Sequence, residues 1–146
     1  MKISEIQDRL EKAKETLREY GYICDVSVKD LIGYLSADTY DETLSIDDIL
    51  KKHLLVIHEL VEIDEIKEMG LRITKDVIIK NYERIYKAHL KAVEVELEIA
   101  KDIGEFKHIE EKIGWIISWL EDPRLPPELR YKCERIYRKA EQAVAE

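Results

Sequence analysis

The chain has little of the residue types that mark several protein classes. Its 146 residues include 2 cysteines, 3 prolines, 5 glycines and 1 phenylalanine. So few glycines and prolines exclude a collagen-like chain. Cys24 and Cys133 are too few and too far apart for a disulfide framework or a metal knuckle, so we expect two buried free thiols rather than a bridge between them. With 45% apolar residues the chain does not have the composition of a disordered one, and we predict a single soluble globular domain over residues 1–146.

Long apolar runs are missing as well. No uncharged run approaches the roughly 18 residues that a membrane-spanning helix needs, and the first residues contain no apolar leader segment. We therefore expect a cytoplasmic protein without a membrane partner. Amides are equally scarce, with Gln7, Asn81 and Gln142 alone, whereas Ile, Glu and Lys are abundant. This composition is typical of thermophilic proteins.

Acidic residues outnumber basic ones. The chain carries 32 Asp and Glu against 24 Lys and Arg, which gives a formal net charge of −8. A nucleic acid would be repelled unless the basic side chains gathered on one face, so we do not expect nucleic acid as a partner. Many of the charges fall in helical pairs four residues apart, such as Glu83 with Lys87, which are typical of solvated helix surfaces.

The spacing of apolar residues predicts an all-α fold. Apolar positions recur at steps of three and four, and no segment alternates over a useful length as a strand does. Ser27 and Ser45, each with Asp three residues later, are helix-start signals, and Gly70 and Gly104 are stop signals. We predict a bundle of five or six helices, two of them long and central. The predicted helices cover 3–20, 28–35, 46–69, 77–103, 105–121 and 127 to the C-terminus, with a loop over 37–44.

The first predicted helix carries a narrow apolar seam. Its members recur in the a and d positions of a heptad pattern, at Ile3, Ile6, Leu10, Ala13, Leu17 and Tyr20. Such a seam pairs with a second subunit, which predicts a homo-oligomer, or packs against its own bundle.

A histidine and two glutamates form the first candidate site. Residues four apart lie on one face of a helix, so His58 and Glu62 can present an imidazole and a carboxylate to the same ion, with Glu59 nearby. Their predicted helix is apolar on two sides, which indicates a central helix and buried side chains. The alternative is an intrahelical hydrogen-bonded pair.

His89 and Glu96 form the second candidate site. They lie seven residues apart within the apolar stripe of the next long helix. A carboxylate there is costly to ionise unless a metal, or a Lys or Arg from another helix, pairs with it. We predict a divalent metal ion, Mn, Fe, Zn or Mg, with this ligand set: His58, Glu59, Glu62, His89 and Glu96.

The two remaining histidines give weaker signals. Glu105 and His108 form an E-x-x-H step of the kind that di-iron bundles use, but those bundles need two such steps and the chain has one. His53 lies on the apolar face of its predicted helix, where a histidine is more often a core residue than a ligand.

Three short stretches resemble motifs of helical families. The segment 56–63, with His58 followed by Glu59, resembles the His-Asp segment of HD-type phosphohydrolases, although Glu replaces Asp. The pair Glu59 and Glu62 resembles the carboxylate motif of all-α nucleotide pyrophosphohydrolases, which implies Mg²⁺ held by carboxylates from two helices. Arg84 and His89 fit the R-x₄₋₆-H pattern of helical HEPN ribonucleases. None of these covers more than a dozen residues, so the chain is assigned to no family.

These observations lead to three functional hypotheses. The first is a divalent-metal-binding hydrolase of phosphorylated small molecules or nucleotides, because His and Glu recur on both long central helices. The second is a non-enzymatic helical protein that acts by oligomerisation or by binding a partner. The third is a HEPN-like RNase, for which an acidic chain would have to bind RNA.

Overall fold

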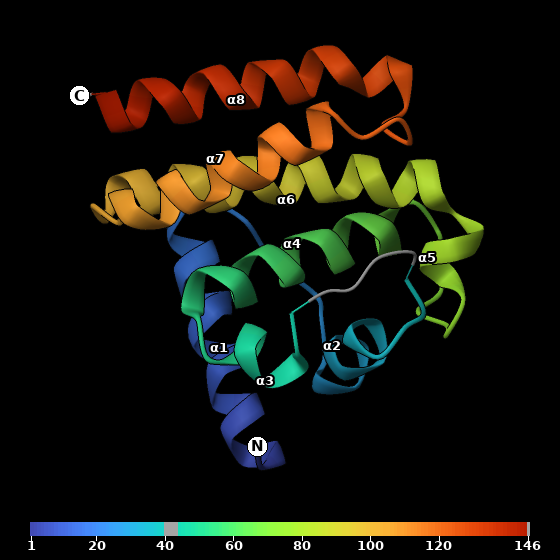
Figure 1. Ribbon diagram of the computed structural model, residues 1–146. Coiled ribbons are helices and arrows are strands. Elements are labelled where there is room, and N and C mark those ends of the chain that lie inside the picture. The colour runs from blue at the N-terminus through green and yellow to red at the C-terminus, as the bar shows by residue number, and fades with distance from the viewer. Residues whose placement is uncertain (40–43, 146) are drawn as a thin grey trace. The chain divides into compact units, whose positions relative to one another are not determined.

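The computed structural model describes residues 1–39 and 44–145, and every regular element within them is a helix (Figure 1). Part of the predicted loop, residues 40–43, lies outside this description. The helices are α1 (Ile3–Glu19), α2 (Val28–Leu35), α3 (Ile46–Leu50), α4 (His53–Glu68), α5 (Val77–Lys80), α6 (Tyr82–Asp102), α7 (Phe106–Leu120), the 3₁₀ turn η1 (Pro127–Leu129) and α8 (Arg130–Ala145).

The contacts of the chain fall into two compact units. The first is Met1–Ala92 and the second is Val93–Glu146, and α6 contributes residues to both. That the whole chain forms one domain therefore stays a prediction. None of the helices in the described residues has both the length and the apolar composition needed to cross a membrane.

Helix α4 is the centre of the first unit. It packs against α1, α2 and α3 (Figure 1), and ten of its sixteen residues are buried, on every side of the helix. This confirms the expectation of a central helix. A helix buried on all sides has no solvated face for its polar residues, so His58 and Glu62 must find partners inside the protein.

The seam of α1 is used inside the chain. Helix α1 packs against α4 and α2. The four middle members of its seam are buried there: Ile6, Leu10, Ala13 and Leu17. Ile3, at the N-terminal end of the seam, remains 71% exposed.

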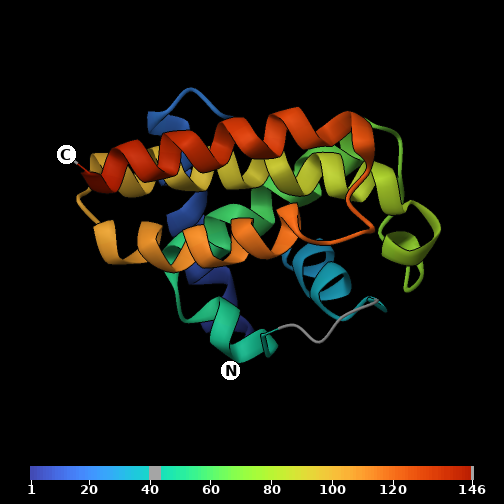
Figure 2. The ribbon, with the colours of Figure 1, turned by 45° about the horizontal axis from the view of Figure 1, so that its top comes forward.

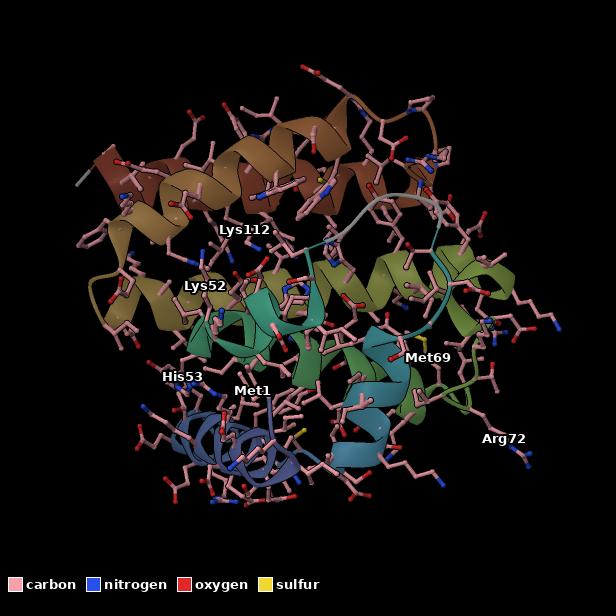
Figure 3. The ribbon with its side chains drawn as sticks, turned by 60° about the horizontal axis from the view of Figure 1, so that its bottom comes forward. Met1, Lys52, His53, Met69, Arg72 and Lys112 are labelled. Carbon is pink, nitrogen blue, oxygen red and sulfur yellow. The ribbon has the colours of Figure 1, made fainter. Side chains whose placement is uncertain are left out.

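His53 begins α4 beside α1, where its Nε2 lies 3.0 Å from the hydroxyl of Thr16 (Figure 3). Burial, and then the charge of Lys12, lower the pKa of His53, in keeping with a structural histidine.

Local signals set several helix ends as predicted. The Ser27 side chain accepts from the backbone N–H of Asp30, and the Asp30 carboxylate accepts from the backbone N–H of Ser27, which starts α2. Gly70 follows α4 with a φ of +85°, a conformation that favours glycine. The next N–H, of Leu71, then donates to the carbonyl of Ile66 and closes the helix.

The prediction of one helix over 46–69 is wrong. The chain leaves the helix at Lys52, which is extended at φ −107° and ψ 115°, so α3 and α4 are separate helices. The guanidinium of Arg9, from α1, donates to the carbonyls of Leu50 at 3.1 Å and Lys51 at 3.4 Å. These bonds satisfy the end of α3, because carbonyls in the last turn have no partner within their own helix.

The prediction of one helix over 77–103 is wrong as well. Asn81 lies at φ −126° and ψ 39°, outside the helical region, and its side-chain amide donates to the carbonyl of Val77 at 3.0 Å. Asparagine competes in this way for backbone partners, which ends α5 before α6 begins. With both interruptions, the described residues form eight α-helices and one 3₁₀ turn instead of five or six helices.

The second unit is built around a helical hairpin. Helices α7 and α8 run side by side in opposite directions (Figure 2). The connection carries Pro126 and Pro127, and Pro127 opens the 3₁₀ turn that leads into α8. The last part of α6 is tied to α8 by an ion pair between Glu94 and Lys132 at 3.2 Å.

Candidate metal site

Two histidines and one glutamate meet in the first unit. His58 and Glu62 lie one turn apart on α4, and His89 comes from α6. The Nε2 atom of His58 lies 3.1 Å from Oε1 of Glu62 and 3.2 Å from Nδ1 of His89, and Nδ1 of His89 lies 2.9 Å from the same Oε1. The three ligand-type atoms therefore form a triangle, which we call the His58–Glu62–His89 triad.

The three side chains of the triad differ in their exposure to solvent. The side chains of His58 and Glu62 are 5% and 8% exposed, whereas that of His89 is 27% exposed. The buried pair follows from the central position of α4. His89 is therefore the most exposed member of the triad.

A tyrosine completes the environment of Glu62. The hydroxyl of Tyr34, from α2, donates to Oε2 of Glu62, so the two carboxylate oxygens have different partners. Tyr34 is 3% exposed. Burial, followed by the negative charge of Glu62, raises the pKa of Tyr34 well above its usual value. The phenol therefore keeps its proton and acts as a donor.

Two imidazoles favour the charged form of Glu62. Burial alone would raise its pKa, but the hydrogen bonds of His58 and His89, together with their charges, outweigh burial and hold the pKa below its usual range. Charged carboxylate is the form that binds metals, because a proton and a metal ion compete for the same lone pair. The site thus places a carboxylate with a lowered pKa beside two imidazole nitrogens.

The distances in the triad are hydrogen-bond distances, and the alternative of an intrahelical His58–Glu62 pair is present in the structure. The same distances also fit a coordination sphere. Metal bonds to imidazole nitrogen and carboxylate oxygen measure about 2.0–2.2 Å, which places neighbouring ligand atoms about 3.0 Å apart in an octahedron and about 3.4 Å apart in a tetrahedron. The sides of the triad, 2.9, 3.1 and 3.2 Å, match one octahedral face more closely. Two nitrogens and one oxygen suit Mn, Fe, Co or Zn better than Mg, which prefers oxygen ligands.

Two of the five predicted ligands lie outside the triad. Glu59 is half-buried on α4, and its charge also contributes to the raised pKa of Tyr34. Glu96 lies in the second unit and is fully buried. Its Oε2 lies 2.5 Å from Nε2 of His108 and 3.1 Å from Nζ of Lys112, which reaches from α7 toward α6 (Figure 3). A basic partner from another helix, the alternative to a metal, is therefore present at Glu96.

The E-x-x-H step does not act as a unit. His108 binds Glu96, whereas Glu105 is the exposed residue that precedes α7. Cys24 and Cys133 are both free thiols. Cys133 is buried, as expected, whereas Cys24 is only partly buried.

Sequence reasoning missed Tyr34. The residue lies in a short apolar helix and is 28 positions from Glu62, so no local spacing connects the two. One signal was available, because a buried tyrosine hydroxyl usually requires a hydrogen-bond partner. That signal predicts a partner but does not identify it.

No protein-family model, no curated protein and no solved structure matches the chain. An all-helical fold hosts many activities, so the fold by itself assigns no function to the chain.

Proposed function

We propose that the chain binds one divalent transition-metal ion at the His58–Glu62–His89 triad and uses it to hydrolyse a phosphorylated small molecule, with nucleotides as the candidate substrates. The observation that carries this proposal is the mutual approach of the three ligand-type atoms within 2.9–3.2 Å. A single cation binds a lone pair from each of them at once. It also neutralises the buried charge of Glu62, which otherwise costs free energy to keep away from water.

The number of protein ligands supports catalysis rather than a structural role. Structural zinc sites are closed by four protein ligands, whereas three ligands leave positions for water and substrate. A metal ion lowers the pKa of a bound water toward about 7, which makes hydroxide available as the nucleophile at neutral pH. In this proposal a substrate approaches such a position past His89, whose side chain is 27% exposed.

The charge of the chain supports a metal in the recognition of phosphate. At a net charge of −8 the protein repels a phosphorylated anion at long range. A divalent ion held by His58, Glu62 and His89 would reverse the sign of the local charge and would supply Lewis-acid stabilisation to a phosphoryl group.

Metal binding is tested by titration of chelator-treated protein. We expect one equivalent of Zn²⁺, Mn²⁺ or Co²⁺ to bind per chain, and His58→Ala or His89→Ala to weaken binding by about 100-fold or more because each removes a ligand. His53→Ala is the matched control, since that histidine begins α4 but bonds Thr16. Equal affinity in all variants, or no binding at all, would contradict the proposal.

Hydrolysis is tested separately. The metal-loaded protein is incubated with p-nitrophenyl phosphate and with nucleoside mono-, di- and triphosphates, and released phosphate and pyrophosphate are measured. We expect turnover that requires metal, is lost in His89→Ala and is retained in His53→Ala. Stoichiometric metal without turnover of any of these compounds would reject the hydrolase assignment and leave metal binding standing.

A further inference from the structure

We infer that Tyr34 is a positioning residue of the metal site: its phenol holds Oε2 of Glu62 and so leaves Oε1 as the single carboxylate oxygen that faces the metal. The inference rests on the proposed function, which supplies the metal. It adds Tyr34 as the residue that decides whether Glu62 binds the metal through one oxygen or through both.

The two oxygens of Glu62 have separate tasks in the structure. Oε1 lies within 3.1 Å of both imidazole nitrogens, and Oε2 accepts the hydroxyl of Tyr34. A carboxylate binds a metal through one oxygen or through both, and hydrogen bonds to the second oxygen favour the first mode. Binding through one oxygen leaves one more coordination position for water or substrate.

The position of Tyr34 is itself fixed. Helix α2 has eight residues and starts at the reciprocal bonds of Ser27 and Asp30. Lys67, near the end of α4, donates to the Asp30 carboxylate at 2.9 Å and to the backbone carbonyl of Asp25 at 2.6 Å. Helix α2 is thus tied to α4 at its N-terminal end, and Tyr34 is buried near its C-terminal end. The phenol therefore resists a rotation of the Glu62 carboxylate.

The chain contains a matched control for this bond. Tyr22 donates from its hydroxyl to Oε1 of Glu65 at 3.1 Å, and Glu65 lies on α4 three residues after Glu62. Tyr22→Phe and Tyr34→Phe thus remove the same atom and the same kind of bond to the same helix. Only Tyr34→Phe affects a residue of the triad.

The experiment compares Co²⁺ binding by the wild type and the two variants. We expect Tyr34→Phe to weaken Co²⁺ binding by about 10–100-fold, the usual loss when a hydrogen bond that orients a ligand is removed, and Tyr22→Phe to leave it within about twofold. We also expect the visible absorption spectrum of bound Co²⁺ to change in Tyr34→Phe, because the released Oε2 enters the coordination sphere. A merely structural role would lower thermal stability without changing that spectrum at saturation.

The outcomes separate this inference from the proposed function. A wild type that binds no Co²⁺ overturns both. A wild type that binds Co²⁺, with Tyr34→Phe unchanged in affinity and spectrum, overturns the role of Tyr34 alone. If Tyr34→Phe does not fold, Lys67→Met provides the test, because it loosens the anchor of α2 without contact with Glu62. It is then expected to weaken Co²⁺ binding several-fold, and unchanged binding would contradict the inference.

Discussion

Lys112 offers the sharpest test of how the second unit is stabilised. Its ammonium lies 3.1 Å from a carboxylate oxygen of Glu96, and the two side chains are 11% and 0% exposed. Lys112→Met keeps most of the aliphatic length and removes the charge. Because Glu96 cannot turn to water, the variant leaves its carboxylate buried with one cation fewer.

Burial of the ion pair, rather than the distance between its atoms, determines how much free energy of unfolding is lost. Removing one partner of a buried ion pair costs about 3–5 kcal/mol, and we expect about 3 kcal/mol because His108 still contacts Glu96. For a chain of this length, that corresponds to a fall in Tm of roughly 6–12 °C. The pair of Lys80 and Asp76 is shorter, at 2.8 Å, but its side chains are 72% and 46% exposed. Its removal by Lys80→Met should be too small to resolve, which makes it the control.

The assay is urea unfolding followed by circular dichroism on Lys112→Met, Lys80→Met and the double variant Lys112→Met with Glu96→Gln. The double variant no longer buries a carboxylate charge at position 96, so we expect it to be more stable than Lys112→Met. If Lys112→Met loses less than about 1 kcal/mol, or if the double variant is the less stable of the two, the reasoning from burial is refuted.

Three further predictions concern the first unit. Gly70→Ala should cost about 1–2 kcal/mol in urea unfolding, since φ +85° disfavours a Cβ even though nothing lies within 4 Å of it, and no loss would contradict the helix-end assignment. Arg9→Met should speed hydrogen exchange in α3, because the carbonyls of Leu50 and Lys51 lose their donor, and unchanged exchange would show that the break does not depend on Arg9. Leu10→Asp should unfold the unit, because Leu10 is 1% exposed, whereas a folded monomer by light scattering would place the α1 seam at a subunit interface.

The parts of the fold that short-range chemistry decides could be predicted from the sequence. The cap at Ser27 and the glycine end at Gly70 depend on residues within a few positions. The interruption near Lys52 could not be predicted, because it involves Arg9, 42 positions from the carbonyl of Lys51. No proline or glycine marks that break, and helix-forming residues continue through it.

In the candidate site, too, the features set by nearby residues could be predicted and those set by distant residues could not. His58 and Glu62 could be paired from their spacing of four, and His89 could be placed on an inward face from its apolar stripe. Glu96 lies on nearly the same face as His89, but seven residues of helix separate them by roughly 10 Å, too far to share an ion directly. Periodicity reports the direction of a side chain, whereas its partner depends on how helices distant in sequence come together. The same limit applies to Tyr34.

Diffraction at the metal absorption edge shows whether the triad binds a metal ion. The full chain is equilibrated with Zn²⁺ or Co²⁺, freed of excess metal and crystallised. We expect one anomalous peak per chain, about 2.0–2.2 Å from Nε2 of His58, Oε1 of Glu62 and Nδ1 of His89. A metal-loaded crystal with its anomalous peak elsewhere, or an ordered triad without a peak at saturating metal, would contradict it.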